Sequence, residues 1–107
     1  MKPTVGYHKY LVESLKNNEE AAAYLNASLE EGDKVLFLVA LRNVAEAHGG
    51  MAKLSRLAKL NRANLYKMLS KNGHPEIQSI HKVLETFGLK LEVISQTKRH
   101  TKLHRAA

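Results

Sequence analysis

The sequence contains no cysteine and no tryptophan, and none of its apolar runs approaches the roughly 18 residues that a membrane-spanning helix requires. The absence of cysteine excludes a disulfide framework and any chemistry that needs a thiolate. The first residues, MKPTVGYHKYLVES, lack the apolar core of a secretory signal. We therefore expect a cytoplasmic protein without disulfide bonds and without a membrane segment.

The sequence also lacks the residue patterns of an enzyme or of a metal protein. It has no glycine-rich phosphate loop, and its acidic residues stand mostly where helices are expected to start and end, so that capping and helix dipoles explain them. Its six histidines are scattered, apart from His100 and His104, which are four positions apart. Two imidazoles are too few for a closed structural site. We expect no enzymatic activity, no cofactor and no bound metal.

Negative charge is scarce in the second half of the chain. Residues 1–50 carry five Lys/Arg and seven Asp/Glu, whereas residues 51–107 carry twelve Lys/Arg and three Asp/Glu. Segregated positive charge is typical of proteins that bind nucleic acid, although a basic surface can also be merely solvated or can meet an acidic membrane. The basic half has no tryptophan and its apolar residues are needed for a core, which favours nucleic acid over membrane.

With 107 residues, of which 44% are apolar, the chain is long enough for one domain with a hydrophobic core. We place this domain at residues 1–96 and a basic tail, expected to be mobile, at residues 97–107. Apolar periodicity and chain breaks predict a lead-in at 1–9, a short turn at 10–15, and helices at about 18–31, 34–47, 51–58, 62–70 and 76–87. Residues 89–93 instead alternate between apolar and polar, which predicts a short half-buried strand.

Polar residues mark the starts of the first two long helices. Asn18 and Asp33 are the expected N-caps, because their side chains can accept from the first backbone N–H groups. Ala22, Leu25 and Leu29 are expected to face the core from the helix at 18–31. The helix at 34–47 is apolar over most of its circumference, which predicts a central position.

Residues 51–70, MAKLSRLAKLNRANLYKMLS, are the most informative segment. They predict two short helices that meet at a tight turn, with Asn61 as the N-cap of the second helix. Lys59 stands where such a turn usually has glycine, which tolerates a positive φ. This pattern is typical of a helix-turn-helix, whose second helix lies in the DNA major groove; the alternative is an ordinary helical hairpin. The positions that must be apolar to hold the two helices together are Leu54, Ala58, Leu60, Leu65 and Met68.

Three segments resemble one known family: YLNASLEEGD at 24–33, GGMAKL at 49–54 and NLYKMLSKNGHP at 64–75. The family is that of the probable addiction-module antidote proteins, small HigA-type antitoxins within the lambda-repressor-like DNA-binding superfamily. The resemblance covers roughly residues 10–94 and implies an all-α bundle of about five helices, here with a short C-terminal strand. It also implies an antitoxin that binds a RelE/ParE-like toxin and represses its own operon. The tail after Gln96 has no counterpart in the family pattern.

The second helix of the motif supplies the candidates for reading DNA bases, namely Asn61, Arg62, Ala63, Tyr66 and Lys67. For Asn61 the cap is an equal alternative, and for Lys67 a phosphate contact is favoured over a base contact. Arg62 is the first candidate, because arginine pairs bidentately with guanine, and a phosphate contact is the open alternative. The candidates for phosphate contact are Gly50, Met51, Ala52, Lys53, Ser70 and Lys71. The first four open a helix, whose unpaired N–H groups and positive dipole end suit a phosphate.

Two other surfaces are expected to bind protein. A lone strand leaves its backbone groups unpaired, so Leu89, Leu91 and Val93 are expected to pair with the same strand of a second copy. The alternative partner is residues 2–8 of the same chain. A toxin that acts on nucleic acid or its machinery is expected to be basic, and the acidic half would then bind it, unless these acids only stabilise helix ends. The acids concerned are Glu13, Glu19, Glu20, Glu30 and Glu31.

We therefore predict a dimeric antitoxin that binds double-stranded operator DNA and a RelE/ParE-like toxin. Two alternatives stay open. One is a repressor that acts alone, without a toxin. The other is a protein-interaction module that masks a toxin and binds DNA weakly. The gene neighbourhood discriminates between them, because an antitoxin is expected beside a toxin-sized reading frame.

Overall fold

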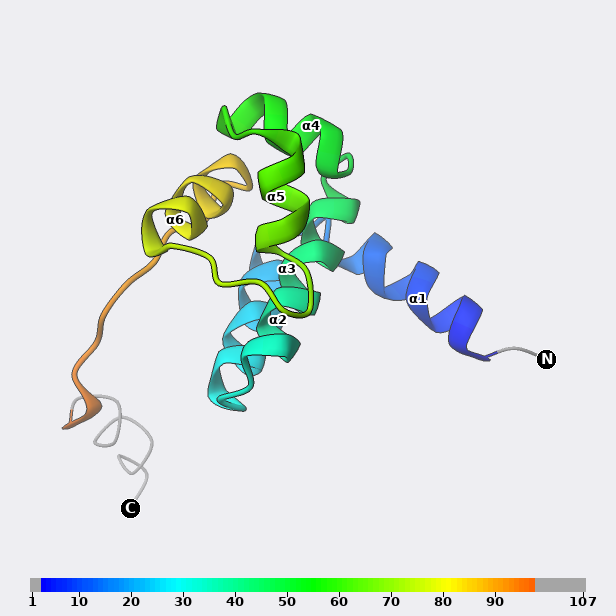
Figure 1. Cartoon of the computed structure of the whole chain (residues 1–107). Coiled ribbons are helices and arrows are strands. Elements are labelled where there is room, and N and C mark those ends of the chain that lie inside the picture. Colours follow the sequence, from blue (N-terminus) through cyan, green and yellow to red (C-terminus); the bar gives the residue numbers. More distant parts are fainter. Residues whose placement is uncertain (1–2, 98–107) are drawn as a thin grey trace, which may run out of the picture.

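The computed structural model describes residues 3–97 and shows six helices in this range. They are α1 (Pro3–Ser14), α2 (Asn18–Glu30), α3 (Lys34–Ala47), α4 (Met51–Ala58), α5 (Arg62–Met68) and α6 (Ile77–Thr86). Figure 1 shows α2 to α6 gathered into one bundle, with α1 projecting from its side. The predicted all-α class is confirmed. Within the described range, no helix is both long and apolar enough to cross a bilayer.

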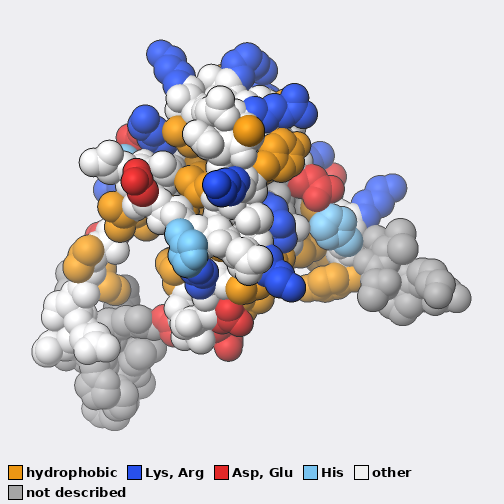
Figure 2. Space-filling model, in the orientation of Figure 1, with side chains coloured by type: hydrophobic (Ala, Val, Ile, Leu, Met, Phe, Trp, Pro, Cys, Tyr) orange, Lys and Arg blue, Asp and Glu red, His pale blue; other side chains and the backbone are white. Residues whose placement is uncertain are grey.

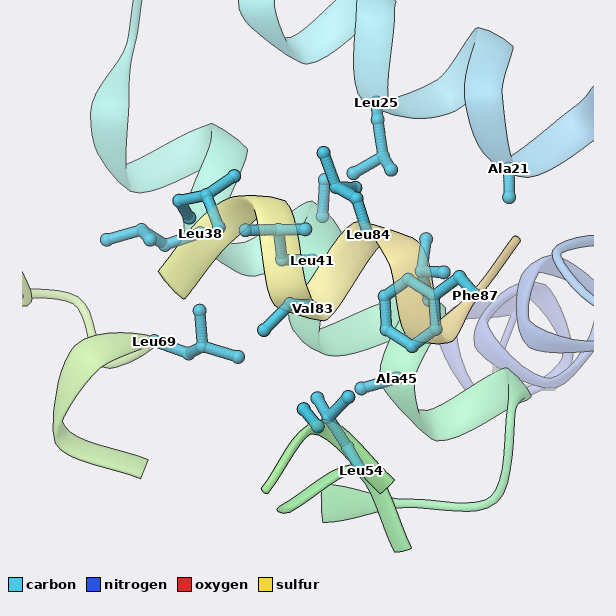
Figure 3. Packing of buried hydrophobic residues seen from close by; sticks show 14 of the residues in the cluster. Ala21, Leu25, Leu38, Leu41, Ala45, Leu54, Leu69, Val83, Leu84 and Phe87 are labelled. Carbon is cyan, nitrogen blue, oxygen red and sulfur yellow. The ribbon is translucent and has the colours of Figure 1, made fainter. Parts of the chain in front are cut away.

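Helix α3 lies at the centre of the bundle, as its nearly all-round apolar surface predicted. It packs against α1, α2 and α4, and its Leu38, Leu41 and Val44 are completely buried. Figure 3 shows side chains from other helices converging on it, among them Leu25 of α2 and Phe87 at the end of α6. Full burial of one leucine side chain contributes about 1.5–3 kcal/mol to the stability of the fold. Because α3 buries several such side chains, the other helices are arranged around it.

The N-caps explain where α2 and α3 begin. The carboxylate of Asp33 accepts hydrogen bonds from two backbone N–H groups in the first turn of α3, at 2.9 and 3.3 Å, which confirms its predicted role. Helix α2 is capped by Asn17 and not by Asn18, since the Asn17 side chain accepts from the Glu20 N–H at 2.9 Å. The prediction was wrong by one position because two asparagines are adjacent. Only the backbone decides which of them is the extended residue before the helix.

The N-terminal segment is more ordered than the sequence predicted. Residues 3–14 form helix α1, where an irregular lead-in and a short turn were expected. The number of helices among residues 3–97 is therefore six and not about five. The helix has no acidic residue in its first turn, and its exposed Tyr7 and Tyr10 blur the separation of apolar from polar faces. Packing against the rest of the protein holds this helix in place, because Leu15, which directly follows it, is buried in the common core.

Residues 89–95 have no regular secondary structure, so the predicted strand is wrong for the single chain. A strand needs a neighbour that completes its ladder of hydrogen bonds, and no strand occurs among residues 3–97. The intramolecular alternative, residues 2–8, is excluded because residues 3–8 belong to α1. The N–H of Leu89 donates to the Leu84 carbonyl oxygen at 2.8 Å. After this anchor, residues 90–97 leave the bundle as a C-terminal arm (Figure 1).

Gly73 allows the loop after α5 to approach the end of that helix closely. The residue is buried, and a β-carbon at this position would lie 2.0 Å from the carbonyl oxygen of Met68. Its N–H donates to the Ser70 carbonyl oxygen at 2.9 Å. Because the obstacle is backbone and not a flexible side chain, an added methyl group must displace either the loop or the helix end.

We expect Gly73→Ala to lower the free energy of unfolding by about 1–3 kcal/mol or more, because it overpacks a rigid contact. Gly6→Ala is the control, since a β-carbon at Gly6 in α1 has no atom within 4 Å. That change is expected to stabilise the helix by roughly 0.5–1 kcal/mol. Urea unfolding followed by circular dichroism measures both variants. Wild-type stability of Gly73→Ala would contradict the close approach.

Candidate nucleic-acid interface

Helices α4 and α5 form a packed pair joined by residues 59–61. Leu54, Ala58 and Leu65 are buried between them and the rest of the bundle, as the sequence predicted. Leu60 and Met68 are half-buried and pack against the same core. Helix α4 also packs against α3 and α6, and Figure 1 shows it crossing one end of α5. The pair is therefore fixed to the body of the protein while the outer side of α5 remains exposed.

The turn between these helices contains a left-handed residue. Lys59 has φ 57° and ψ 44°, and among residues 3–97 it is the only residue other than glycine with a positive φ. This bend brings the N–H groups of Lys59 and Leu60 to the carbonyl oxygen of Ser55. Asn61 then starts α5, and its side chain accepts from the Asn64 N–H at 3.0 Å. The predicted cap at Asn61 is confirmed.

The left-handed backbone at Lys59 is strained, and relieving this strain is expected to stabilise the protein. A non-glycine residue in the left-handed region costs roughly 1–2 kcal/mol, and glycine avoids this cost while losing more chain entropy on folding. We expect Lys59→Gly to raise the free energy of unfolding by about 0.5–1 kcal/mol. Lys59→Ala removes the same charge and keeps the strain, so it is not expected to stabilise. If both variants unfold at the same urea concentration, charge and not backbone strain governs this position.

The five predicted base-contact residues lie together on the outer side of α5 and at its N-cap, and all five are exposed: Asn61, Arg62, Ala63, Tyr66 and Lys67. The guanidinium carbon of Arg62 lies 5.8 Å from the centre of the Tyr66 ring. Such a cation–π contact contributes about 0.5–1 kcal/mol at an exposed site. It holds the Arg62 side chain along the helix surface, one turn from its own backbone. The Oδ1 atom of Asn61 is already bonded within the cap.

The predicted phosphate-contact residues lie in two places. Gly50 is the N-cap of α4, with φ 95° and no side-chain hydrogen bond to the first turn, so Met51, Ala52 and Lys53 begin a helix whose first N–H groups have no side-chain cap. Ser70 and Lys71 follow α5, and the Ser70 hydroxyl donates to the Lys67 carbonyl oxygen at 2.7 Å. Figure 2 shows Lys and Arg side chains gathered over α4 and the adjoining end of α5.

One pair of lysines near this surface was missed by sequence reasoning. Lys59, in the turn after α4, and Lys82, on α6, line the same shallow hollow of about 310 Å³ together with Glu85. The two lysines are distant in the sequence, and only the packing of α4 against α6 brings them to one hollow. No sequence pattern signals this neighbourhood.

The acids predicted to bind a toxin are exposed but do not form one surface. Glu13, at the end of α1, pairs at 3.0 Å with a lysine three residues further on. Glu19 and Glu20 lie in the first turn of α2, whereas Glu30 and Glu31 lie at its end. A helix of 13 residues is roughly 20 Å long. The structure therefore divides the predicted surface into separate groups.

The three predicted dimer residues are increasingly exposed along the C-terminal segment. Leu89 is half-buried and packs against the core, Leu91 is 38% exposed and Val93 is 98% exposed. Within residues 3–97, no group of three His, Asp or Glu side chains is placed to hold a metal ion. His100 and His104 lie outside the described residues, as does the predicted tail from residue 98 onwards.

A family model described as probable addiction module antidote protein matches residues 8–95. The chain belongs to this family. It is also 36% identical, over 83 residues, to an uncharacterized protein of Haemophilus influenzae, and the match covers 78% of this chain and 84% of that protein. No solved structure matches the chain. The resemblance inferred from the sequence is confirmed, and membership in the antidote family supports an antitoxin role and implies a toxin partner.

Proposed function

We propose that this antidote-family protein is a dimeric antitoxin that binds operator DNA, represses its own operon and neutralises a RelE/ParE-like toxin. The observation that carries the DNA-binding part is the exposed outer side of α5, where Arg62, Tyr66 and Lys67 stand beside a basic α4. The antitoxin part rests on the family. Both parts are compatible, because the surface used for DNA leaves the acidic half of the chain accessible.

In this proposal α5 enters the major groove with its N-terminal end toward the base edges, as the second helix of a helix-turn-helix does. Arg62 pairs with guanine O6 and N7, and Ala63 contacts a thymine methyl group. Lys67 lies one turn further on and neutralises a phosphate. The start of α4, from Gly50 to Lys53, binds a second phosphate through its N–H groups. Phosphate contacts supply most of the affinity, and Arg62 supplies sequence choice.

The dimer is proposed to form through residues 89–93, which gain strand structure only when they pair. Two copies run antiparallel about Leu91, so that Lys90 of each faces Glu92 of the other. Each such cross-strand charge pair contributes roughly 0.2–1 kcal/mol. Burial of Leu91 and of the fully solvated Val93 contributes more. This pairing sets the distance between the two copies of α5 and hence the spacing of the operator half-sites.

A gel-shift assay on the promoter of the protein's own gene tests the proposal. We expect retardation of the DNA, steep weakening of binding as salt is raised, and a further shift when the product of the neighbouring gene is added. Absence of any shift at low salt would contradict the DNA-binding part. A shift that the neighbouring product does not alter, together with no binding between the two proteins, would favour a repressor without a toxin.

A further inference from the structure

A groove between α2 and α3 is a part of the surface that the proposed function does not use. Its volume is about 250 Å³, and it is lined by Tyr24, Ala27, Ser28, Glu31, Leu36 and Ala40. The four residues from α2 and its C-cap are three or four positions apart, so they share one side of that helix. Leu36 and Ala40 come from the facing side of α3. The groove therefore follows directly from the antiparallel packing of these two helices.

The walls of this α2–α3 groove are mainly apolar. Leu36 is 42% exposed and its neighbour Val35 is 38% exposed. The Tyr24 hydroxyl accepts a hydrogen bond from the Asn43 side chain at 2.8 Å, so the polar end of the tyrosine is already satisfied within the protein. What the groove offers to a partner at this point is the apolar ring. Burial of such surface is favourable in proportion to the apolar area covered.

One acidic residue, Glu31, lines the groove, close to the turn from α2 to α3. Glu30, Glu31 and Asp33 follow one another closely here, and Figure 2 shows acidic side chains at this end of the molecule, away from the basic surface of α4. Among the ion pairs formed within residues 3–97, none involves Glu31. Lys34, in the first turn of α3, places its Nζ atom 3.2 Å from Nδ1 of His74 in the loop after α5. Among residues 3–97, Glu31 therefore has no ion-pair partner and can pair with a cation of an incoming partner.

We propose that the α2–α3 groove is the docking site of the toxin, and that it takes a basic protein surface with an apolar side chain at its centre. The apolar side chain enters between Tyr24 and Leu36, and a Lys or Arg of the toxin pairs with Glu31. This inference rests on the proposed antitoxin function. It replaces the five dispersed acids predicted from the sequence with one toxin-binding surface, at one end of the α2–α3 hairpin. Glu31 of the groove lies beside the α2–α3 turn, and Figure 1 shows this turn and the start of α5 at opposite ends of the bundle, so one chain binds toxin and DNA together.

Two substitutions and two matched controls test this assignment in the full-length chain. Glu31→Lys reverses the charge at the groove. Because Glu31 is the C-cap of α2, where a positive charge interacts favourably with the helix dipole, the variant is expected to fold. Glu46→Lys makes the same charge reversal in the last turn of α3, at the other end of that helix, and in addition removes the 3.1 Å contact between Glu46 and His8 of α1. Leu36→Gln removes apolar surface from the groove. Ile77→Gln makes the equivalent change at a 73%-exposed position in the first turn of α6.

The readout is the affinity for the product of the neighbouring gene, measured by titration calorimetry, with operator gel shifts on the same samples. We expect each groove substitution to weaken toxin binding at least tenfold, each control to change it less than twofold, and all four to retain operator binding. A wild-type chain that does not bind the neighbouring product would contradict the proposed antitoxin function itself. Wild-type binding that both groove variants retain would overturn only the docking site.

Two other occupants of the groove are distinguished in the same experiment. If Glu31→Lys and Leu36→Gln convert the chain alone from dimer to monomer in sedimentation, the groove holds a second copy and the proposal is wrong. If instead their effects disappear in a chain whose four tail cations at positions 98, 99, 102 and 105 are glutamine, the groove holds the chain's own tail, which also overturns the assignment. Groove effects that persist in the glutamine-tail chain support the toxin.

Discussion

Leu91→Pro is expected to produce a folded monomer that binds operator DNA about 10²–10⁴-fold more weakly than the proposed wild-type dimer, because linked binding at two half-sites is lost. Proline removes a ladder N–H from the centre of the proposed pair of strands and is not tolerated in a central pairing. Leu91 is 38% exposed and lies outside every helix of the described range. The helical circular dichroism spectrum is therefore expected to stay unchanged.

Sedimentation velocity measures the loss of the dimer in Leu91→Pro, and Gln96→Pro is the matched control. Gln96 lies in the same C-terminal arm but beyond residues 89–93, so its replacement is expected to leave both the dimer and operator binding intact. A stable dimer of Leu91→Pro would refute pairing through the arm. That result would not affect the assignment of α5 to DNA, because the two assignments rest on different residues.

Arg62→Ala is expected to weaken binding to the operator by about 1–3 kcal/mol, roughly 5–150-fold, and to relax the sequence preference at one position of each half-site. Arg62→Lys distinguishes a base contact from a phosphate contact. Lysine keeps the charge but cannot form the bidentate pair with guanine. If Arg62 reads a base, Arg62→Lys is expected to lose operator affinity as Arg62→Ala does. If Arg62 binds a phosphate, Arg62→Lys is expected to retain most of the affinity. Quantitative gel shifts on operators with single base changes provide the measurement.

Lys67→Ala is the companion to this experiment. Loss of a phosphate contact is expected to weaken binding to all sequences alike and to reduce the slope of log affinity against log salt by about one. Unchanged affinity in both Arg62→Ala and Lys67→Ala would exclude α5 as the recognition helix.

The sequence was sufficient for features that depend on neighbours along the chain. The cap at Asp33 and the cap at Asn61 were predictable, because a side chain that bonds the next helical turn needs only the local backbone. Lys59 was identified as the turn position that usually holds glycine, but its left-handed conformation was established only by the structure, because lysine is a poor residue for a positive φ. The buried positions of α4 and α5 followed from helical spacing, because that spacing puts Leu54 and Ala58 on one face.

Features that depend on partners distant in the chain were decided only by the tertiary structure. In α2 the core takes Ala21, Leu25 and Ser28, while Leu29 remains 49% exposed. The prediction favoured Leu29 as the more apolar residue. However, Ser28 is small enough for close packing, and its hydroxyl is satisfied by the Leu25 carbonyl oxygen at 2.7 Å.

The C-terminal arm and the acidic surface show the same limit. Alternation at residues 89–93 indicates an extended segment, but a strand also requires a partner, which the single chain does not provide among its described residues. Composition gathers Glu13, Glu19 and Glu31 into one acidic half, yet the length of α2 separates Glu31 from the other two in space. Local sequence determines the conformation of a turn and which side of a helix is apolar. Which surfaces then meet depends on packing between segments that the chain connects only at long range.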